Sequence, residues 1–286
     1  MDKILVTGAT GQLGSAMVGA LVGKGKHVRA ATRKTTKIRW TDMVQPVVFD
    51  FEDAGLHNAA LDGVSGLFLV APPLDFDAPA KLIPFIDKAR QMRVKHVVFN
   101  SAYGVDANEQ APLRIIEHYL MNSGLAYTIL RPNFFMENFT TGFVAPMIAS
   151  GRIYMAAGEG KTSFISVSDI AEVAATAFEK KHYGAEYNLT GPEALSYGQV
   201  AEIISALCER TVIYRPVSET EMAKSARDKG LSESTVRYLA DLFSAVRNGL
   251  MATITDGVRN VTGKDAVSFS EFAQRNTALC KLSEAA

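Results

Sequence analysis

The chain has 286 residues, and its 30 lysines and arginines are balanced by 30 aspartates and glutamates, so the formal net charge is zero. Without a global electrostatic field, nucleic acid and anionic membranes are not expected partners. The length fits one large α/β domain with a smaller appendage.

The first predicted elements surround a glycine-rich turn. An apolar run at residues 4–6 leads directly into TGATGQLG at residues 7–14, which predicts a strand, a turn and the start of a helix. In such a turn Gly8 reverses the chain, Gly11 lets the backbone approach a pyrophosphate, and Gly14 lets the helix pack on the strand. Because a helix N-terminus presents N–H donors to an anion, we expect a dinucleotide site. The predicted cofactor contacts here are Gly8, Thr10, Gly11, Gln12, Leu13 and Gly14.

A chain with 22 glycines can also produce this spacing as an ordinary loop. The context favours the dinucleotide site, because Met17, Val18 and Leu21 form the apolar face of a helix and a second strand follows at residues 28–32. The motif resembles that of the extended and atypical short-chain dehydrogenase/reductases, and the whole sequence resembles their NmrA-like branch.

The second predicted strand ends in a basic turn. Arg33 and Lys34 stand where such a strand meets the adenosine ribose, and no acidic residue occurs between Arg29 and Arg39. A carboxylate here would select NAD, whereas Arg33 can pair with a 2′-phosphate in a bidentate geometry. We therefore predict NADP(H) as the cofactor. The alternative is a solvated basic turn without a ligand.

Further strands are predicted at residues 47–51, 66–71 and 97–101, with a helix at residues 80–92. Strands and helices alternate, which predicts a parallel, doubly wound α/β sheet of the Rossmann type. We expect a cofactor-binding domain at residues 1–150 and a smaller, mostly helical substrate region at 151–286, interleaved with the first at the sheet edge. The resemblance implies further cofactor contacts, which are Asp50, Phe51, Ala71 and Pro72.

The tyrosine and lysine that short-chain reductases use as a proton donor are missing. None of the nine tyrosines has a lysine four positions later, and Leu113 and Glu117 occupy the equivalent places. Ser101 matches the serine of the resembling family, and Tyr103 lies two residues further on. These two are the candidate catalytic residues, although a serine at a strand end also serves as a structural cap.

The segment at residues 130–138 begins as a strand and becomes an apolar loop. In the resembling family this loop covers the nicotinamide, which implies cofactor contacts at Pro132, Asn133 and Phe134. Phe135 and Met136 are the candidate substrate contacts. The alternative is that these side chains only fill the core.

Helix starts are predicted in the second half of the chain. Ser168 is expected to be an N-cap, and capping boxes are expected at Ser218 with Glu221 and at Ser268 with Glu271. These signals predict the mostly helical region.

Cys208 and Cys280 lie far apart, as do the five histidines. Their spacing predicts neither a disulfide framework nor a metal site, and it fits a reducing compartment. No signal peptide precedes the first predicted strand, and no stretch approaches the roughly 18 apolar residues of a membrane span. We therefore expect a cytoplasmic protein.

Within the NmrA-like branch the sequence is most similar to reductases. These include quinone and triphenylmethane-dye reductases and the ergot-pathway festuclavine and agroclavine dehydrogenases, which the strings VAPP at residues 70–73 and RPNFFMENF at 131–139 resemble. The resemblance implies an NADPH-dependent oxidoreductase that transfers hydride to a small electron-poor, quinone-like or iminium-like molecule. The alternative is a non-catalytic NAD(P)-binding redox sensor of the NmrA type, which the missing tyrosine and lysine fit equally well.

Overall fold

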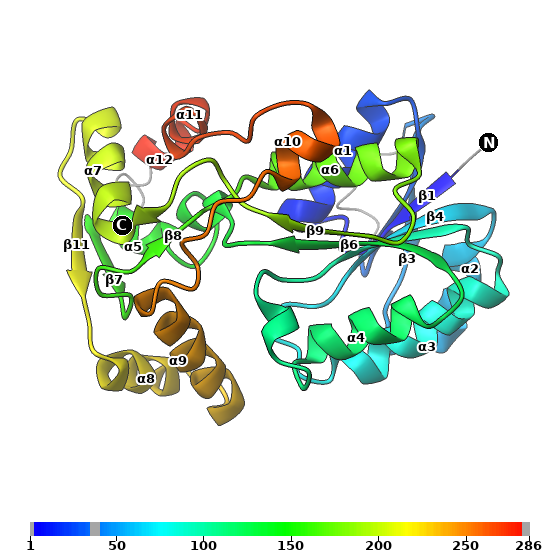
Figure 1. The fold of residues 1–286 in the computed structure, drawn as a ribbon, viewed down its shortest axis with the longest axis horizontal. Helices are drawn as coiled ribbons and strands as arrows, with labels where there is room; N and C mark the ends of the chain where they lie inside the picture. The colour runs from blue at the N-terminus through cyan, green and yellow to red at the C-terminus, as the bar shows by residue number, and fades with distance from the viewer. Residues whose placement is uncertain (1–2, 35–40, 282–286) are drawn as a thin grey trace. The chain divides into compact units, whose positions relative to one another are not determined.

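The structure is a computed structural model that describes residues 3–34 and 41–281. Seven parallel strands form one sheet in the order β3-β2-β1-β4-β5-β6-β9 (Figure 1). The strands are β1 (Lys3–Val6), β2 (His27–Thr32), β3 (Val44–Val48), β4 (Val64–Val70), β5 (His96–Asn100), β6 (Ala126–Pro132) and β9 (Ala185–Leu189). The order reverses between β1 and β4, which is where ligands bind in open α/β sheets. The predicted doubly wound sheet is confirmed.

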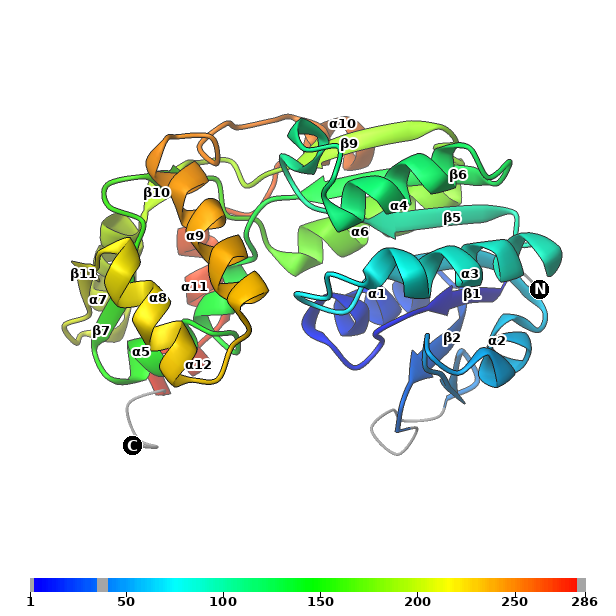
Figure 2. The same cartoon turned by 90° about the horizontal axis from the view of Figure 1, so that it is seen from below.

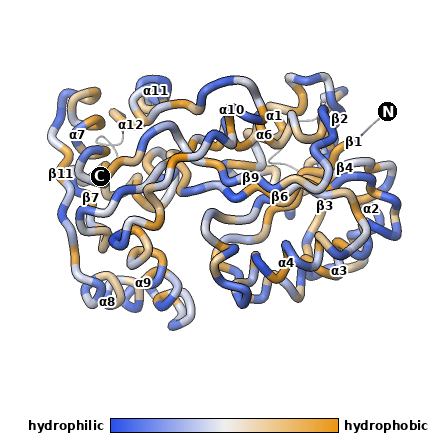
Figure 3. Tube along the Cα trace, in the orientation of Figure 1, coloured by the Kyte–Doolittle hydropathy of each residue, from blue (hydrophilic) through white to orange (hydrophobic). Residues whose placement is uncertain are grey.

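Helices cover both faces of this sheet (Figures 1 and 2). One face carries α1 (Gln12–Gly23), α6 (Val167–Lys180) and α10 (Gly257–Thr262), and the other carries α2 (Ala54–Leu61), α3 (Ala78–Gln91) and α4 (Pro112–Met121). Along α3 and α4, hydrophobic residues alternate with hydrophilic ones, as expected for helices that bury one side (Figure 3). Within the described ranges, no helix is both long and apolar enough to cross a membrane.

The chain divides into two compact units. The sheet unit comprises the chain up to Pro132 together with Val167–Leu189 and Gly257–Lys264, and the helical unit comprises Asn133–Ser166, Thr190–Asp256 and the chain from Asp265 onward. The chain thus first leaves the sheet unit at Pro132, before the predicted boundary at residue 150, and re-enters it twice. The chain returns to the sheet unit because β9 is the last strand of the sheet, and α6 and α10 pack on one of its faces.

The helical unit contains two small sheets and most of the C-terminal helices. Strand β7 (Arg152–Met155) pairs with β11 (Ile213–Pro216), and β8 (Lys161–Thr162) pairs with β10 (Leu195–Ser196). The helices are α5 (Ala145–Ala149), α7 (Tyr197–Cys208), α8 (Glu219–Asp228), α9 (Glu233–Arg247), α11 (Phe269–Arg275) and α12 (Ala278–Lys281). Four buried rings meet in edge-on contacts in its core: Phe139, Phe164, Tyr197 and Phe269.

Most of the predicted helix starts are confirmed. Both capping boxes form, with Ser218 preceding α8 and Ser268 preceding α11. The prediction for Ser168 is wrong, because α6 already begins at Val167 and places Ser168 inside the first turn. The predicted strand at residues 47–51 is displaced as well, since β3 ends at Val48.

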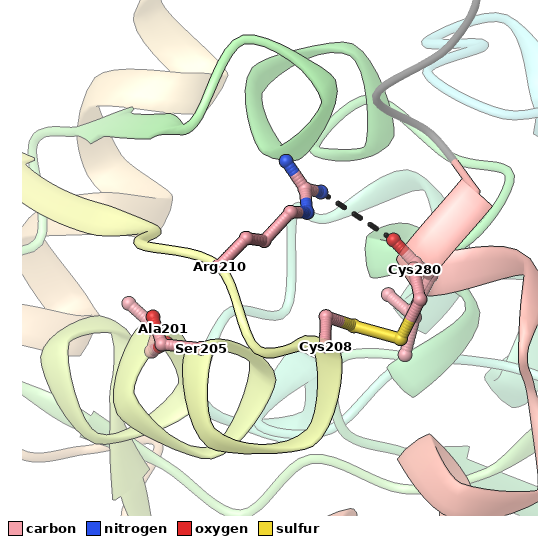
Figure 4. Close-up of a disulfide and its surroundings, with 6 residues drawn as sticks. Ala201, Ser205, Cys208, Arg210 and Cys280 are labelled. Atoms are coloured by element: carbon pink, nitrogen blue, oxygen red, sulfur yellow. Dashed lines mark hydrogen bonds between the residues drawn. A yellow bond between two sulfur atoms is a disulfide. The ribbon is translucent and has the colours of Figure 1, made fainter.

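The prediction that the two cysteines do not form a disulfide is also wrong. Cys208 at the end of α7 and Cys280 in α12 form a disulfide across a sequence separation of 72 residues (Figure 4). Nearby, Arg210 donates a long hydrogen bond of 3.5 Å to the carbonyl oxygen of Leu279. The sequence spacing could not show this pair, because folding of the helical unit brings the two helices together. The argument for a reducing compartment from unpaired thiols therefore no longer holds.

The disulfide should contribute measurably to stability. A cross-link that closes a loop of this length restricts the unfolded chain, and the chain-entropy model puts its contribution at about 4 kcal/mol. Cys208→Ser should therefore lower the denaturant midpoint of unfolding, and dithiothreitol should lower the midpoint of the wild type but not of the variant. A wild-type midpoint that does not respond to the reductant would contradict this prediction.

Candidate functional site

The glycine turn between β1 and α1 is shaped by close backbone contacts. Gly8 has a φ of +61°, a conformation that favours glycine. A Cβ atom on Gly14 would lie 2.6 Å from the carbonyl carbon of Gly8 and 2.9 Å from the Cα of Ala9, so only glycine fits there. Gly11 is extended, and a Cβ on it would lie 3.3 Å from the Gly8 oxygen. The turn therefore packs directly under the start of α1.

Hydrogen bonds tie this turn to the two neighbouring strands. The Thr7 hydroxyl accepts a bond from the Val70 N–H at 2.8 Å, and the Ala9 N–H donates to the carbonyl oxygen of Ala31 at 3.2 Å. Within the described part of the chain no side chain caps α1 at Gly11, and the first turn of α1 carries no acidic residue. The positive end of the helix dipole therefore lies at the carboxyl edge of the sheet, where the strand order reverses, and the first turn of α1 carries no carboxylate.

The end of β2 presents the predicted basic residues. Arg33 and Lys34 are exposed, and among the described residues Arg33 has no acidic partner. The Thr32 hydroxyl bonds to both the N–H and the carbonyl oxygen of Lys34 at 3.2 Å, which fixes the start of the turn. The rest of the basic turn, residues 35–40, lies outside the described residues.

The loops after β3 and β4 carry the predicted contacts for the adenosine half. Asp50 accepts a bond from the Glu52 N–H at 3.1 Å, and the half-buried ring of Phe51 packs edge-on against Phe49 with centroids 4.8 Å apart. Ala71 and Pro72 follow β4 and are half-buried. These four residues thus lie at the carboxyl edge of the sheet, where cofactors bind in doubly wound folds.

An ion-pair bridge that the sequence did not predict connects these two loops. Lys81 on α3 lies 2.9 Å from Glu52 and 2.8 Å from Asp75, and the two hydrogen-bonded carboxylates raise its pKa. Glu52 follows β3 and Asp75 follows β4. The partly exposed bridge contributes modest energy, but it connects both loops to α3.

Ser101 and Tyr103 lie just beyond the end of β5. Their N–H groups donate to the carbonyl oxygens of Leu130 and Pro132, at 2.8 and 3.0 Å, and so tie this segment to β6. The Ser101 side chain is buried, and its hydroxyl has no hydrogen-bond partner of normal geometry among the described residues. Tyr103 is half-buried. A buried hydroxyl without a partner is costly, so Ser101 has a capacity for hydrogen bonding that the fold leaves unused.

Beside Ser101, Glu117 of α4 has no exposed surface. Arg131 of β6 binds it in a bidentate geometry, with its Nε 2.9 Å and its Nη2 2.7 Å from the two carboxylate oxygens, and Arg114 adds a bond of 2.9 Å. Burial alone would raise the pKa of Glu117, but the hydrogen-bonded guanidinium groups of Arg131 and Arg114, together with the neighbouring Ser101 hydroxyl, lower it overall. Glu117 is therefore ionised at neutral pH.

The buried pair was missed because its partners stand on different elements. A signal was present in the sequence, since Leu113, Glu117 and Leu120 lie on one helical stripe, and Glu117 is the charged member of an otherwise apolar face. A buried carboxylate requires a buried cation. The sequence does not show which arginine supplies it.

In the helical unit, Asn133 begins the loop that follows β6. Its buried amide donates to the Ser163 hydroxyl at 2.8 Å and to the Met251 carbonyl oxygen at 2.9 Å, and its oxygen accepts from the Phe134 N–H at 2.9 Å. The side chain thus connects loops of its own unit. A direct bond from Asn133 to a cofactor stays a prediction.

The next three residues of this loop differ in exposure. Met136 is fully buried and its N–H donates to the carbonyl oxygen of Ile165, so it fills the core. Phe134 and Phe135 are half-buried, and the ring of Phe134 lies 6.4 Å from that of Phe243. The rings of Phe134 and Phe135 are therefore partly accessible to a ligand.

The strand order, the glycine turn and the loops at the carboxyl edge define an α/β protein of the doubly wound type, a class whose carboxyl edge binds ligands such as dinucleotides. The chain belongs to the NmrA-like family, whose model matches residues 1–244. The resemblance inferred from the sequence is confirmed.

Individual relatives match nearly the full length. The chain is 36% identical to the uncharacterized oxidoreductase YesF of Bacillus subtilis, covering 97% of this chain and 96% of that protein. It is 32% identical to the NAD(P)H azoreductase of Xenophilus azovorans, covering 96% and 98%. A triphenylmethane reductase from Citrobacter, solved in complex with NADP(H), has the same fold, with a TM-score of 0.82 at 22% identity over 96% of this chain and 100% of that one.

Substitutions at two glycines of the turn should have different effects, one mainly on stability and the other mainly on cofactor binding. Gly14→Ala places a methyl group inside the Gly8–Ala9 backbone and should destabilise the fold by about 1 to 3 kcal/mol or more. Gly11→Val should lower the unfolding midpoint less than Gly14→Ala, because its extended backbone suits any residue and its Cβ requires only a small shift of the Gly8 oxygen, but it should abolish binding of NADPH. Thermal unfolding and calorimetric titration measure the two effects. Normal NADPH binding by folded Gly11→Val would show that the site lies elsewhere.

Proposed function

We propose that the protein is an NADPH-dependent oxidoreductase that transfers hydride to an electron-poor, conjugated small molecule. The observation that carries this proposal is the uncapped helix N-terminus at the glycine turn, combined with Arg33 in place of a carboxylate at the end of β2. The names of the relatives support it, since one is an NAD(P)H azoreductase and another is a triphenylmethane reductase bound to NADP(H).

The sheet unit fits such a cofactor in each of its parts. The pyrophosphate would lie at the N-terminus of α1, where Gly11 has no side chain to obstruct it. Arg33 and Lys34 would pair with the 2′-phosphate, while Asp50 and Phe51 would border the adenine. Ala71 and Pro72 would border the riboses, and Pro132 is proposed for the nicotinamide half. Bound there, NADPH supplies the hydride.

The proposed substrate class follows from the absence of the tyrosine and lysine that short-chain reductases use for proton donation. Reduction of a simple ketone produces an alkoxide, and a positioned acid accelerates that step by about 10² to 10⁴. Leu113 cannot donate a proton, and Glu117 is ionised and bound to two arginines. Acceptors that are cationic, or that spread the incoming charge over a conjugated system, do not need this acid. For them, positioning of the two reactants suffices.

Cofactor preference tests the role of Arg33. A charge-assisted bidentate contact contributes about 1.5 to 3 kcal/mol, so NADPH should bind at least roughly tenfold more tightly than NADH. Arg33→Ala should remove this preference by weakening NADPH alone. Lys95→Ala, which removes an exposed charge just before β5 at the opposite edge of the sheet, is the control and should change neither affinity. Equal affinities of the wild type for the two cofactors would contradict the prediction.

Substrate class is tested with a panel of acceptors. With NADPH, quinones, cationic dyes, azo dyes and iminium compounds should be reduced, whereas simple aliphatic ketones should not. The decrease in nicotinamide absorbance measures turnover. Efficient ketone reduction that is lost in Tyr103→Phe would refute the prediction, because it would identify Tyr103 as a relocated acid. Tight NADPH binding without turnover of any acceptor would instead support the redox-sensor alternative.

A further inference from the structure

Among the described residues, the Ser101 hydroxyl has no hydrogen-bond partner of normal geometry, and it lies at the part of the sheet where the nicotinamide half of a cofactor would lie. The proposed phosphate contacts are at α1 and at the end of β2, so the adenosine half would lie over β2 and β3. The other half of a dinucleotide would then extend across β4 toward β5 and β6. Ser101 follows β5 directly, and its hydroxyl can bind a further polar group.

Glu117 is a charged neighbour of Ser101, since the Ser101 hydroxyl is among the groups that lower the pKa of Glu117. Both oxygens of its carboxylate are held, one by Arg131 Nε and the other by Arg131 Nη2 and Arg114 Nη1. Arg131 is held in turn by Glu186 and by Asp106. The carboxylate therefore can neither rotate nor exchange partners with water, and it presents a fixed negative charge to the Ser101 hydroxyl.

A buried ion pair is not needed for stability, since apolar residues of similar volume often replace one without loss. Here the charged group neighbours a serine whose hydroxyl has no hydrogen-bond partner of normal geometry among the described residues. An O–H group beside a fixed anion points its hydrogen toward that anion, which directs the oxygen lone pairs the other way. Ser101 is thereby prepared to accept a hydrogen bond from a ligand.

We propose that Glu117 is a positioning residue that acts through Ser101, orienting the serine oxygen to accept a hydrogen bond from an N–H or O–H donor of the nicotinamide riboside half of the cofactor. This rests on the proposed function. Glu117 itself does not touch the ligand, because both of its carboxylate oxygens are already bound by Arg131 and Arg114.

The proposal is tested by comparing two ligands. NADPH contains the nicotinamide riboside, whereas adenosine 2′,5′-bisphosphate contains only the adenosine and its 2′-phosphate. Ser101→Ala should weaken NADPH by about fivefold, the value of one hydrogen bond, and leave the fragment within about twofold. Glu117→Gln should give the same pattern, because the single amide oxygen turns to Arg131 and no longer orients the serine.

The double variant separates positioning from a general structural effect. If Glu117 acts through Ser101, the double variant Ser101→Ala with Glu117→Gln should bind NADPH no more weakly than the weaker single variant. Glu109→Gln is the matched control, because Glu109 also pairs with Arg114 but is 60% exposed. It should change neither affinity. Calorimetric titration measures all of these affinities.

Three results would overturn the inference: additive losses in the double variant, equal losses for NADPH and the fragment, or no loss in Glu117→Gln. Should Glu117→Gln fail to fold, Glu117→Asp keeps the charge but draws it back from Ser101, and the same comparison applies. A wild type that binds neither ligand would instead contradict the proposed function. The two failures are therefore distinguishable.

Discussion

The close packing of Gly14 against the Gly8–Ala9 backbone is the constraint on which the sheet unit depends. It sets the first turn of α1 directly on the end of β1, at a distance that no side chain permits. Thr7 and Ala9 then fasten the same turn to β4 and β2. The helix N-terminus is thus fixed before any ligand arrives, and a ligand that binds there loses little free energy to ordering the loop.

A second constraint, at β5 and β6, is electrostatic rather than steric. Removing Glu117 and Arg131 from water is expensive, and the cost is offset only because each carboxylate oxygen receives an N–H donor and Arg131 receives further carboxylates. The glycine turn at residues 7–14 contains no ionisable side chain, so its packing does not depend on charge. The ion pair depends on both partners being present and charged. The carboxyl edge of the sheet is therefore held by two unrelated kinds of interaction.

The sequence predicted the features whose signals lie within a few residues of one another. The glycine spacing, the capping boxes at Ser218 and Ser268, and the alternation of strands and helices all follow from local geometry. The N-cap predicted at Ser168 lies two residues beyond the position that precedes α6, which is within the usual uncertainty of a helix start. The Cys208–Cys280 disulfide and the pairing of Glu117 with Arg131 were not predictable, since each depends on which elements the complete fold brings together.

The buried pair also limits the chemistry at this edge of the sheet. A carboxylate surrounded by guanidinium groups holds a proton poorly, so Glu117 cannot replace the acid that the missing tyrosine would have supplied. The same fixed charge can still orient a neighbouring hydroxyl, because orientation requires no proton transfer. A site of this kind positions reactants without acid catalysis. That is sufficient for acceptors whose conjugation disperses the incoming charge, and insufficient for those that must be protonated as they are reduced.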